Sequence, residues 1–125
     1  MLEFQIYSTS GSNVAPQGTA SQSSTWGNLA AAKAIDSFNS TFSHTTNLNA
    51  WWEVQLNEAE GVEELVILNS YCQGYADSLG CLCRLSEARI TLYNNNVSVA
   101  TRQLGNTCGE LVVSESFSSQ LFTIY

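Results

Sequence analysis

Charged residues are scarce in this sequence. Only 12% of the 125 residues are charged, about half the share usual in soluble proteins, so Ser, Thr, Asn and Gln must form most of the polar surface. Eleven Asp and Glu against four Lys and Arg give a net charge of −7. A field of this sign repels phosphate backbones and anionic lipids, which argues against nucleic acid and charged membranes as partners. A cation, a neutral ligand or a basic protein fits this charge.

Long apolar runs are also missing. No stretch approaches the roughly 20 apolar residues of a membrane-spanning helix, so we expect no membrane span. The first residues, MLEFQIYSTSGSN, lack the basic start and apolar stretch of a secretory signal. A surface of hydroxyls and amides is typical of secreted or otherwise extracytoplasmic or lumenal proteins, and we expect that localisation for a mature form. The length fits one domain, residues 1–125.

Side chains that support catalysis are few. The sequence has one histidine, His44, and it has no serine framed by glycines and no compelling pair of carboxylates. Only a generic combination of cysteine and histidine is left for nucleophilic chemistry. We therefore expect that the protein is not an enzyme.

The four cysteines lack the CxxC spacing of a zinc site. A disulfide between Cys81 and Cys83 would strain its short loop, so we expect Cys72 to bond one of that pair and Cys108 the other. The alternative is that all four are free, small core residues of a protein in a reducing compartment.

Helical periodicity is nearly absent. The one candidate is the Ala-rich stretch 27–38, where two helical turns would start at Asn28 as the cap. Short strands separated by polar turns are predicted elsewhere, at residues 50–56, 62–70, 87–94, 97–104, 110–117 and 120–125. Six such strands favour an antiparallel sandwich.

Alternation within two of these strands predicts which side chains face the core. In AWWEVQL, Trp52, Val54 and Leu56 share one side, and Trp51 lies on the other. In EARITLYN, residues 88, 90 and 92 share a side, and the Asn run at 94–96 predicts a turn because Asn tolerates left-handed backbone.

Several segments carry a resemblance to a known family. NVA, ASQSS, KAID and WWEVQL, followed by VEELVILNS and CRLSEARITLY, cover residues 13–93 in register. Together they resemble the F-type lectins, the fucose-binding branch of the discoidin or coagulation factor 5/8 C-type (galactose-binding-like) domains. The resemblance implies an all-β fold, a jelly-roll β-sandwich of two antiparallel sheets with ligand loops at one end. The sequence ends at Tyr125, before the family's final strand. Three alternatives follow: the sequence is a fragment, a partner completes the sheet edge, or the calcium site is incomplete.

The resemblance also implies a ligand site. F-type lectins bind fucose through one histidine and two arginines; the histidine falls on His44, the second arginine on Arg84, and the first on Ser70. A longer loop follows Ser70 and adds candidate ligand residues Tyr71, Tyr75 and Asp77. Alternatively, Arg84 forms an ion pair with Glu87 or Asp77, and the tyrosines only hold their own loop in place.

Calcium supports the ligand loops of F-type lectins. The matching segment here is KAIDSFNSTFS, in which Asp36 offers a carboxylate, and Asn39 and Ser43 offer neutral oxygens beside main-chain carbonyls. The alternative role of Asp36 is that of a turn residue, whose carboxylate accepts hydrogen bonds from nearby N–H groups.

Two functions are consistent with these observations. The first is a carbohydrate-binding, lectin-like module for fucose or another neutral sugar, free or on a glycoprotein, with calcium-stabilised loops. The second is an interaction or assembly module, an accessory subunit or adhesion domain, which keeps the sandwich and binds another protein through an exposed sheet edge.

Overall fold

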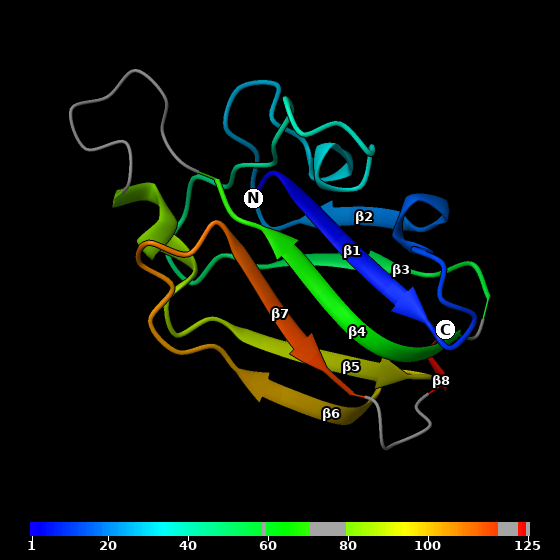
Figure 1. Ribbon diagram of the computed structural model, residues 1–125. Helices are drawn as coiled ribbons and strands as arrows, with labels where there is room; N and C mark the ends of the chain where they lie inside the picture. Colours follow the sequence, from blue (N-terminus) through cyan, green and yellow to red (C-terminus); the bar gives the residue numbers. More distant parts are fainter. Residues whose placement is uncertain (59, 71–79, 118–122, 125) are drawn as a thin grey trace.

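The computed structural model describes residues 1–58, 60–70, 80–117 and 123–124. Within them the chain forms short strands and three short 3-10 helices (Figure 1). The elements, in chain order, are β1 (Glu3–Ser8), η1 (Ala15–Gln17), β2 (Thr19–Gln22), η2 (Ala31–Ala34), β3 (Trp52–Gln55), β4 (Glu60–Leu68), η3 (Gly80–Leu85), β5 (Arg89–Asn94), β6 (Val97–Gln103), β7 (Val112–Ser116) and β8 (Thr123–Ile124).

The strands form two layers. One layer has the order β1-β4-β7, with β8 paired to the beginning of β4, and every pairing in it is antiparallel. The other layer consists of the antiparallel pairs β2–β3 and β5–β6, which lie behind the first layer in Figure 1. This arrangement confirms the predicted all-β sandwich of antiparallel sheets.

The core lies between these layers and is centred on β4. Leu65 and Ile67 of β4 are 2% and 4% exposed, and Phe4 and Ile6 of β1 lie beside them in the same apolar cluster. Alternation along β4 and β1 directs these side chains to one face, as expected for strands that pack against a second sheet.

Trp52, the first residue of β3, and Trp51, which precedes it, lie on opposite sides of the strand, as predicted. Trp52 packs its ring 5.0 Å from that of Phe4, and its indole Nε1 donates a hydrogen bond to the carbonyl of Ala31. Trp51 points away from the core and is 52% exposed. Trp52 therefore ties β3 both to β1 and to the segment that precedes the His44 loop.

The β5–β6 hairpin also agrees with the sequence pattern. Ile90 and Leu92 contribute to the core, while Tyr93 is 52% exposed. Asn95 and Asn96 form the turn with φ of 50° and 64°, a left-handed conformation that Asn accepts more readily than most residues.

Two parts of the prediction were wrong. Residues 27–38 do not form a helix of two turns: only η2, Ala31–Ala34, is helical, and Ile35 donates its N–H to Ala32 in 3-10 fashion. The carbonyl of Ala31, which an α-helix would use for Ile35, is bound by the Trp52 indole instead, so tertiary packing overrides the Ala-rich propensity. Strand β1 was not predicted at all.

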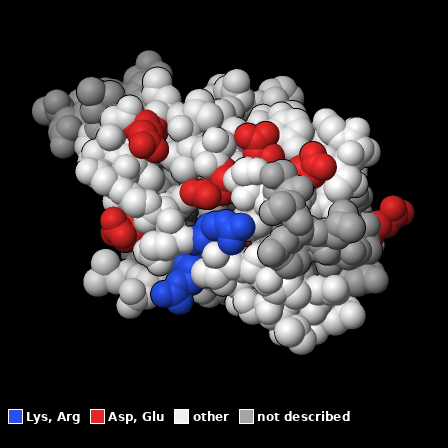
Figure 2. All heavy atoms as spheres, turned by 60° about the horizontal axis from the view of Figure 1, so that its bottom comes forward, with Lys and Arg blue, Asp and Glu red and all other residues white. Residues whose placement is uncertain are grey.

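The surface reflects the scarcity of basic residues. On the face drawn in Figure 2, acidic side chains are scattered singly, and the visible basic side chains lie together near its centre. No extended basic patch appears on that face, in keeping with a net charge of −7. None of the helices in the described part of the chain has the length and apolar character needed to cross a bilayer.

The core assignment predicts a large difference between two leucine substitutions. Leu65→Ala removes a side chain that is 2% exposed, and we expect the free energy of unfolding to fall by about 2–5 kcal/mol. Leu48→Ala makes the same chemical change at a site that is 92% exposed, and surface changes of this kind stay within about 0.5 kcal/mol. Urea denaturation of both variants measures the difference, and similar losses would contradict the assigned core.

Candidate functional site

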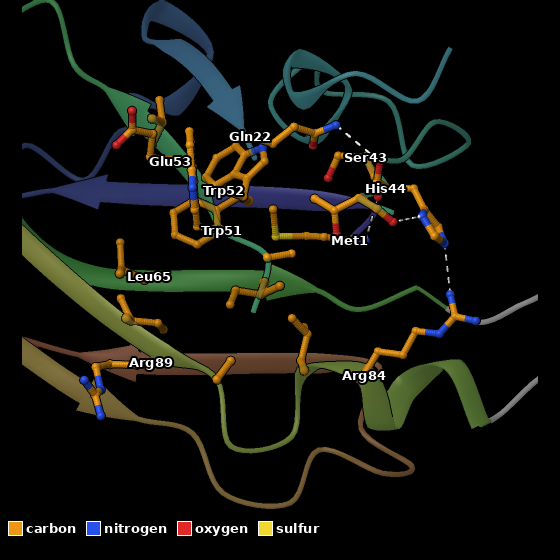
Figure 3. Close-up of a pocket in the computed structure, with 18 of the residues that line it drawn as sticks. Met1, Gln22, Ser43, His44, Trp51, Trp52, Glu53, Leu65, Arg84 and Arg89 are labelled. Atoms are coloured by element: carbon orange, nitrogen blue, oxygen red, sulfur yellow. Dashed lines mark hydrogen bonds between the residues drawn. The ribbon is translucent and has the colours of Figure 1, made fainter. Parts of the chain in front are cut away.

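Two loops that are distant in sequence meet at one end of the sandwich. Nη1 of Arg84 lies 3.1 Å from Nε2 of His44, although the residues are 40 positions apart (Figure 3). His44 comes from the long connection between η2 and β3, and Arg84 from η3. The structure thus brings together the two side chains that the sequence assigned to one ligand site.

Main-chain hydrogen bonds hold His44 on both sides. Its N–H donates to the carbonyl of Leu29, and its carbonyl accepts from the N–H of Trp26, each at 3.0 Å. The side-chain amide of Gln22 donates to both Leu29 and His44 carbonyls, at 3.1 and 3.3 Å. Because β2 ends at Gln22, the sheet fixes the main chain that carries the imidazole.

The hydrogen bonds of the imidazole also assign its tautomer. Nδ1 lies 2.6 Å from the carbonyl of Thr45, which can only accept, so Nδ1 carries the proton in the neutral ring. Nε2 is then an acceptor, and it receives an N–H of Arg84. One acceptor and a guanidinium with several N–H donors therefore lie side by side.

Arg84 is exposed, but the helix that carries it is firmly held. The carbonyl of Leu82, a residue only 1% exposed, accepts hydrogen bonds from Asn69 at 2.8 Å and Thr107 at 2.7 Å. Cys83 forms a disulfide with Cys108. The guanidinium thus extends from a rigid support, which lowers the entropic cost of holding a ligand.

The disulfides agree with the prediction as far as the described residues show. The Cys83–Cys108 bond was expected, and Cys81 is disulfide-bonded as well. Cys72 lies outside the described residues.

The charge of Arg84 is not neutralised by a carboxylate in the described part of the chain. Its described contact is His44 rather than Glu87, so the predicted ion-pair alternative does not hold for Glu87. Burial, and secondly the nearby Arg84 guanidinium, lower the pKa of the Met1 amine to about 6. This amine donates to the carbonyl of Ser43 at 3.3 Å, so it lies next to the site (Figure 3).

Trp26 is a member of the site that the sequence did not reveal. Its ring centroid lies 5.1 Å from that of His44 at an interplanar angle of 44°, and its side chain is 54% exposed. It sits in a polar loop without periodicity, so alternation assigns it no face. The one sequence signal that could have found it is the presence of a tryptophan among Ser, Thr and Gly residues.

His44 and Arg84 lie at the end of a groove between the two layers (Figure 3). The groove measures about 2180 Å³ and runs along β3 and β5, which exceeds the roughly 300–1,000 Å³ typical of small-molecule pockets. The hydrogen-bonded pair of Arg84 and His44 lies at its end. We therefore identify the candidate site with that end rather than with the whole groove.

A second polar cluster surrounds Thr41, three residues before His44. The Oγ1 of Thr41 lies 2.6 Å from Oδ2 of Asp36, 3.1 Å from the Phe38 carbonyl and 3.4 Å from the Lys33 carbonyl. A hydroxyl has one hydrogen, so only one of these three oxygens receives it. The Phe38 carbonyl also accepts from the main-chain N–H of Thr41 at 3.5 Å. Three oxygens thus lie near one hydroxyl hydrogen, and carboxylate and carbonyl oxygens are the ligands that a hard cation uses.

Glu3 of β1 places a second carboxylate near this cluster. Its side chain is 1% exposed; Oε1 accepts from the N–H of Ser37 at 3.2 Å, and the buried Oε2 has no hydrogen-bond partner among the residues that the structure describes. Burial raises the pKa of Glu3, and the neighbouring Asp36 raises it further, while the Ser37 N–H opposes them. An unpartnered buried carboxylate oxygen next to a second carboxylate fits a hard cation.

The predicted metal ligands coincide with this cluster only in Asp36. No described hydrogen bond brings Asn39 or Ser43 to its carboxylate; Thr41, which also lies near two main-chain carbonyls, bonds it instead. Asp36 also behaves as the predicted turn residue, because its Oδ1 accepts from the N–H of Phe38 at 2.9 Å. Within the described residues, no three His, Cys, Asp or Glu side chains converge, so main-chain oxygens must complete any cation site.

The remaining predicted ligand residues, Tyr71, Tyr75 and Asp77, lie outside the described residues. Ser70 is described, and it stands where the resemblance expects an arginine. Its N–H donates to the side chain of Asn69 at 3.0 Å.

Solved structures of lectin modules share this fold. The lectin domain of lectinolysin in complex with Lewis B antigen is 28% identical, with a TM-score of 0.74 over 90% of this chain and 81% of that chain. A mutant of the lectinolysin lectin-binding domain with Lewis b is also 28% identical, with a TM-score of 0.75 over 90% of this chain and 80% of that chain. The fold of this chain is thus similar to that of lectin modules.

A third structure is a fucose-binding module from Streptococcus pneumoniae. It is 28% identical, with a TM-score of 0.69 over 90% of this chain and 79% of that chain. Neither a model of a known protein family nor a curated protein matches the sequence.

Proposed function

We propose that this chain is a carbohydrate-binding, lectin-like module that uses His44 and Arg84 to bind a fucosylated glycan or a similar neutral sugar. The observation that carries the proposal is the 3.1 Å contact between Arg84 Nη1 and His44 Nε2. Similarity to modules solved with Lewis b or described as fucose-binding supports it. The same similarity supports this function over the assembly module, and no catalytic step is assigned.

The geometry explains how a sugar would be held. A hydroxyl both donates and accepts, so a single sugar hydroxyl can donate to Nε2 of His44 while it accepts from Arg84. The planar guanidinium has further donors for a neighbouring hydroxyl. Binding would replace the His44–Arg84 hydrogen bond with two new ones, and the rigid loops keep the entropic cost low.

We further propose that calcium occupies the cluster formed by Asp36, Thr41 and Glu3 with the carbonyls of Lys33 and Phe38. The surplus of oxygens around Thr41 and the unpartnered Oε2 of Glu3 support this assignment. The ion would fix the segment that leads from Thr41 to His44. A secreted or lumenal location and a place among the discoidin-type domains remain predictions.

Substitutions at the pair test the sugar site. We expect His44→Ala and Arg84→Ala each to weaken binding of methyl α-L-fucoside or Lewis b oligosaccharide by more than tenfold, since a lost charged or directed hydrogen bond is worth about 1.5–3 kcal/mol. Arg84→Lys keeps the charge but loses the planar donors, so we expect an intermediate loss. Isothermal titration calorimetry measures the affinities.

Arg89→Ala is the matched control. Arg89 is an exposed arginine on β5, across the groove from Glu53 (Figure 3), and its loss should leave the affinity within twofold. If wild-type protein binds neither ligand at millimolar concentration with calcium present, the proposed function is wrong. Equal losses for Arg84→Ala and Arg89→Ala would remove the special role of Arg84.

Calcium binding makes a separate prediction. We expect calcium to raise the Tm of the protein at pH 7.5, and Asp36→Asn or Glu3→Gln to abolish most of that rise, because each removes a carboxylate from the cluster. Glu58→Gln, at an exposed position, should leave it unchanged. Magnesium should act weakly because it demands a regular octahedral site. Differential scanning fluorimetry reads out each case.

The pH dependence follows from Glu3. The pKa of Glu3 in the folded protein lies above its ordinary value of 4.5, so its contribution to the stability of the metal-free protein is full below that value and is lost as pH rises through the folded pKa. Calcium competes with this proton. The calcium-induced rise in Tm should therefore shrink as pH falls through the raised pKa; an unchanged rise at pH 4 would contradict the assignment.

A further inference from the structure

Trp26 lies beside the proposed sugar site without contributing much to the core. Its side chain is 54% exposed, whereas Trp52 packs on Phe4 and bonds the Ala31 carbonyl. A large aromatic surface left in water next to polar groups is typical of a ligand contact.

The position of Trp26 is fixed relative to His44. Its N–H donates to the His44 carbonyl at 3.0 Å, and its own carbonyl accepts from Leu29 at 3.1 Å. Gln22 bridges the Leu29 and His44 carbonyls. The main chain of Trp26 and that of His44 are therefore part of one hydrogen-bonded unit, and a ligand that touches the imidazole meets the indole in a set place.

The indole does not occupy the edge of the imidazole that would hold the first sugar. Nδ1 of His44 is taken by Thr45 and Nε2 faces Arg84, so the indole, 5.1 Å from the imidazole centroid, contacts another part of the ring. A pyranose bound at Nε2 and Arg84 would lie on the Arg84 side. The exposed indole is then available to the sugar attached to it.

We propose that Trp26 is a contact residue for the sugar unit linked to the one held by His44 and Arg84, so that the protein prefers a fucosylated oligosaccharide to a monosaccharide. This inference rests on the proposed function of the pair. The C–H face of a pyranose is apolar and slightly positive, and it stacks on the electron-rich face of an indole. Trp26 thereby contributes to ligand specificity.

A pair of tryptophan substitutions tests the proposal. Trp51 is the matched control, since it is 52% exposed and is carried by the β3 side of the groove, away from His44 and Arg84 in Figure 3. The affinities of wild type, Trp26→Ala, Trp26→Phe and Trp51→Ala are measured by calorimetry with methyl α-L-fucoside and with Lewis b oligosaccharide.

We expect Trp26→Ala to weaken Lewis b binding about five- to tenfold, as loss of an aromatic contact implies, and to change the affinity for methyl α-L-fucoside less than twofold. Trp26→Phe should restore part of the loss, and Trp51→Ala should match wild type. Retained monosaccharide binding also shows that the His44 site stays folded.

Each other outcome has a distinct meaning. Equal losses for both ligands would place Trp26 on the first sugar and overturn the inference, as would unchanged affinity for both. A loss in Trp51→Ala equal to that in Trp26→Ala would show a non-specific surface effect, which also overturns it. Absence of binding by wild type would instead refute the proposed function itself.

Discussion

The account depends on the hydrogen bond that joins Arg84 to His44. Neither side chain is fixed by core packing of its own: Arg84 is exposed and His44 is half-buried. Their meeting results from what holds the main chain behind them, which is Gln22 at the end of β2 on one side and the hydrogen-bonded carbonyl of Leu82 on the other. The sandwich therefore holds the main chain in place, and the His44–Arg84 pair supplies the groups that contact a ligand.

The same loop links the pair to the carboxylate cluster. Thr41 contacts Asp36, and His44 follows three residues later. Glu3, the first residue of β1, accepts from the N–H of Ser37, and the carbonyl of Met1, just before β1, accepts from the N–H of Ser43. An ion bound in the cluster would hold the Thr41 end of the short segment that leads to His44, and the hydrogen bond to Met1 holds its other end at Ser43. The same loop conformation would then favour metal binding and sugar binding, and no other segment would need to change its conformation.

Much of the fold could be predicted because alternation is a local property. The inward direction of Trp52 and of Ile90 follows from period-2 patterns, and the Asn95–Asn96 turn follows from backbone tolerance. The failed helix at residues 27–38 has a non-local cause, since the Trp52 indole takes the carbonyl that an α-helix needs. No local pattern contains that information.

The candidate site was predicted only in part for the same reason. His44 and Arg84 were found through a resemblance over residues 13–93, which carries long-range information. Glu3 and Thr41 were missed, because an acidic residue in an unassigned N-terminal strand and a threonine in a polar loop resemble ordinary surface residues until the chain folds. Trp26 was missed because a polar loop gives no direction to its side chain.

The central claim is that the His44–Arg84 pair is where the ligand binds. The direct measurement is a titration with methyl α-L-fucoside followed through the ring signals of His44, which are unambiguous because the chain contains one histidine. The account predicts saturable shifts of Nε2 and its neighbouring protons as the Arg84 hydrogen bond is exchanged for a sugar hydroxyl. Saturable binding that leaves the His44 ring signals unmoved would contradict it.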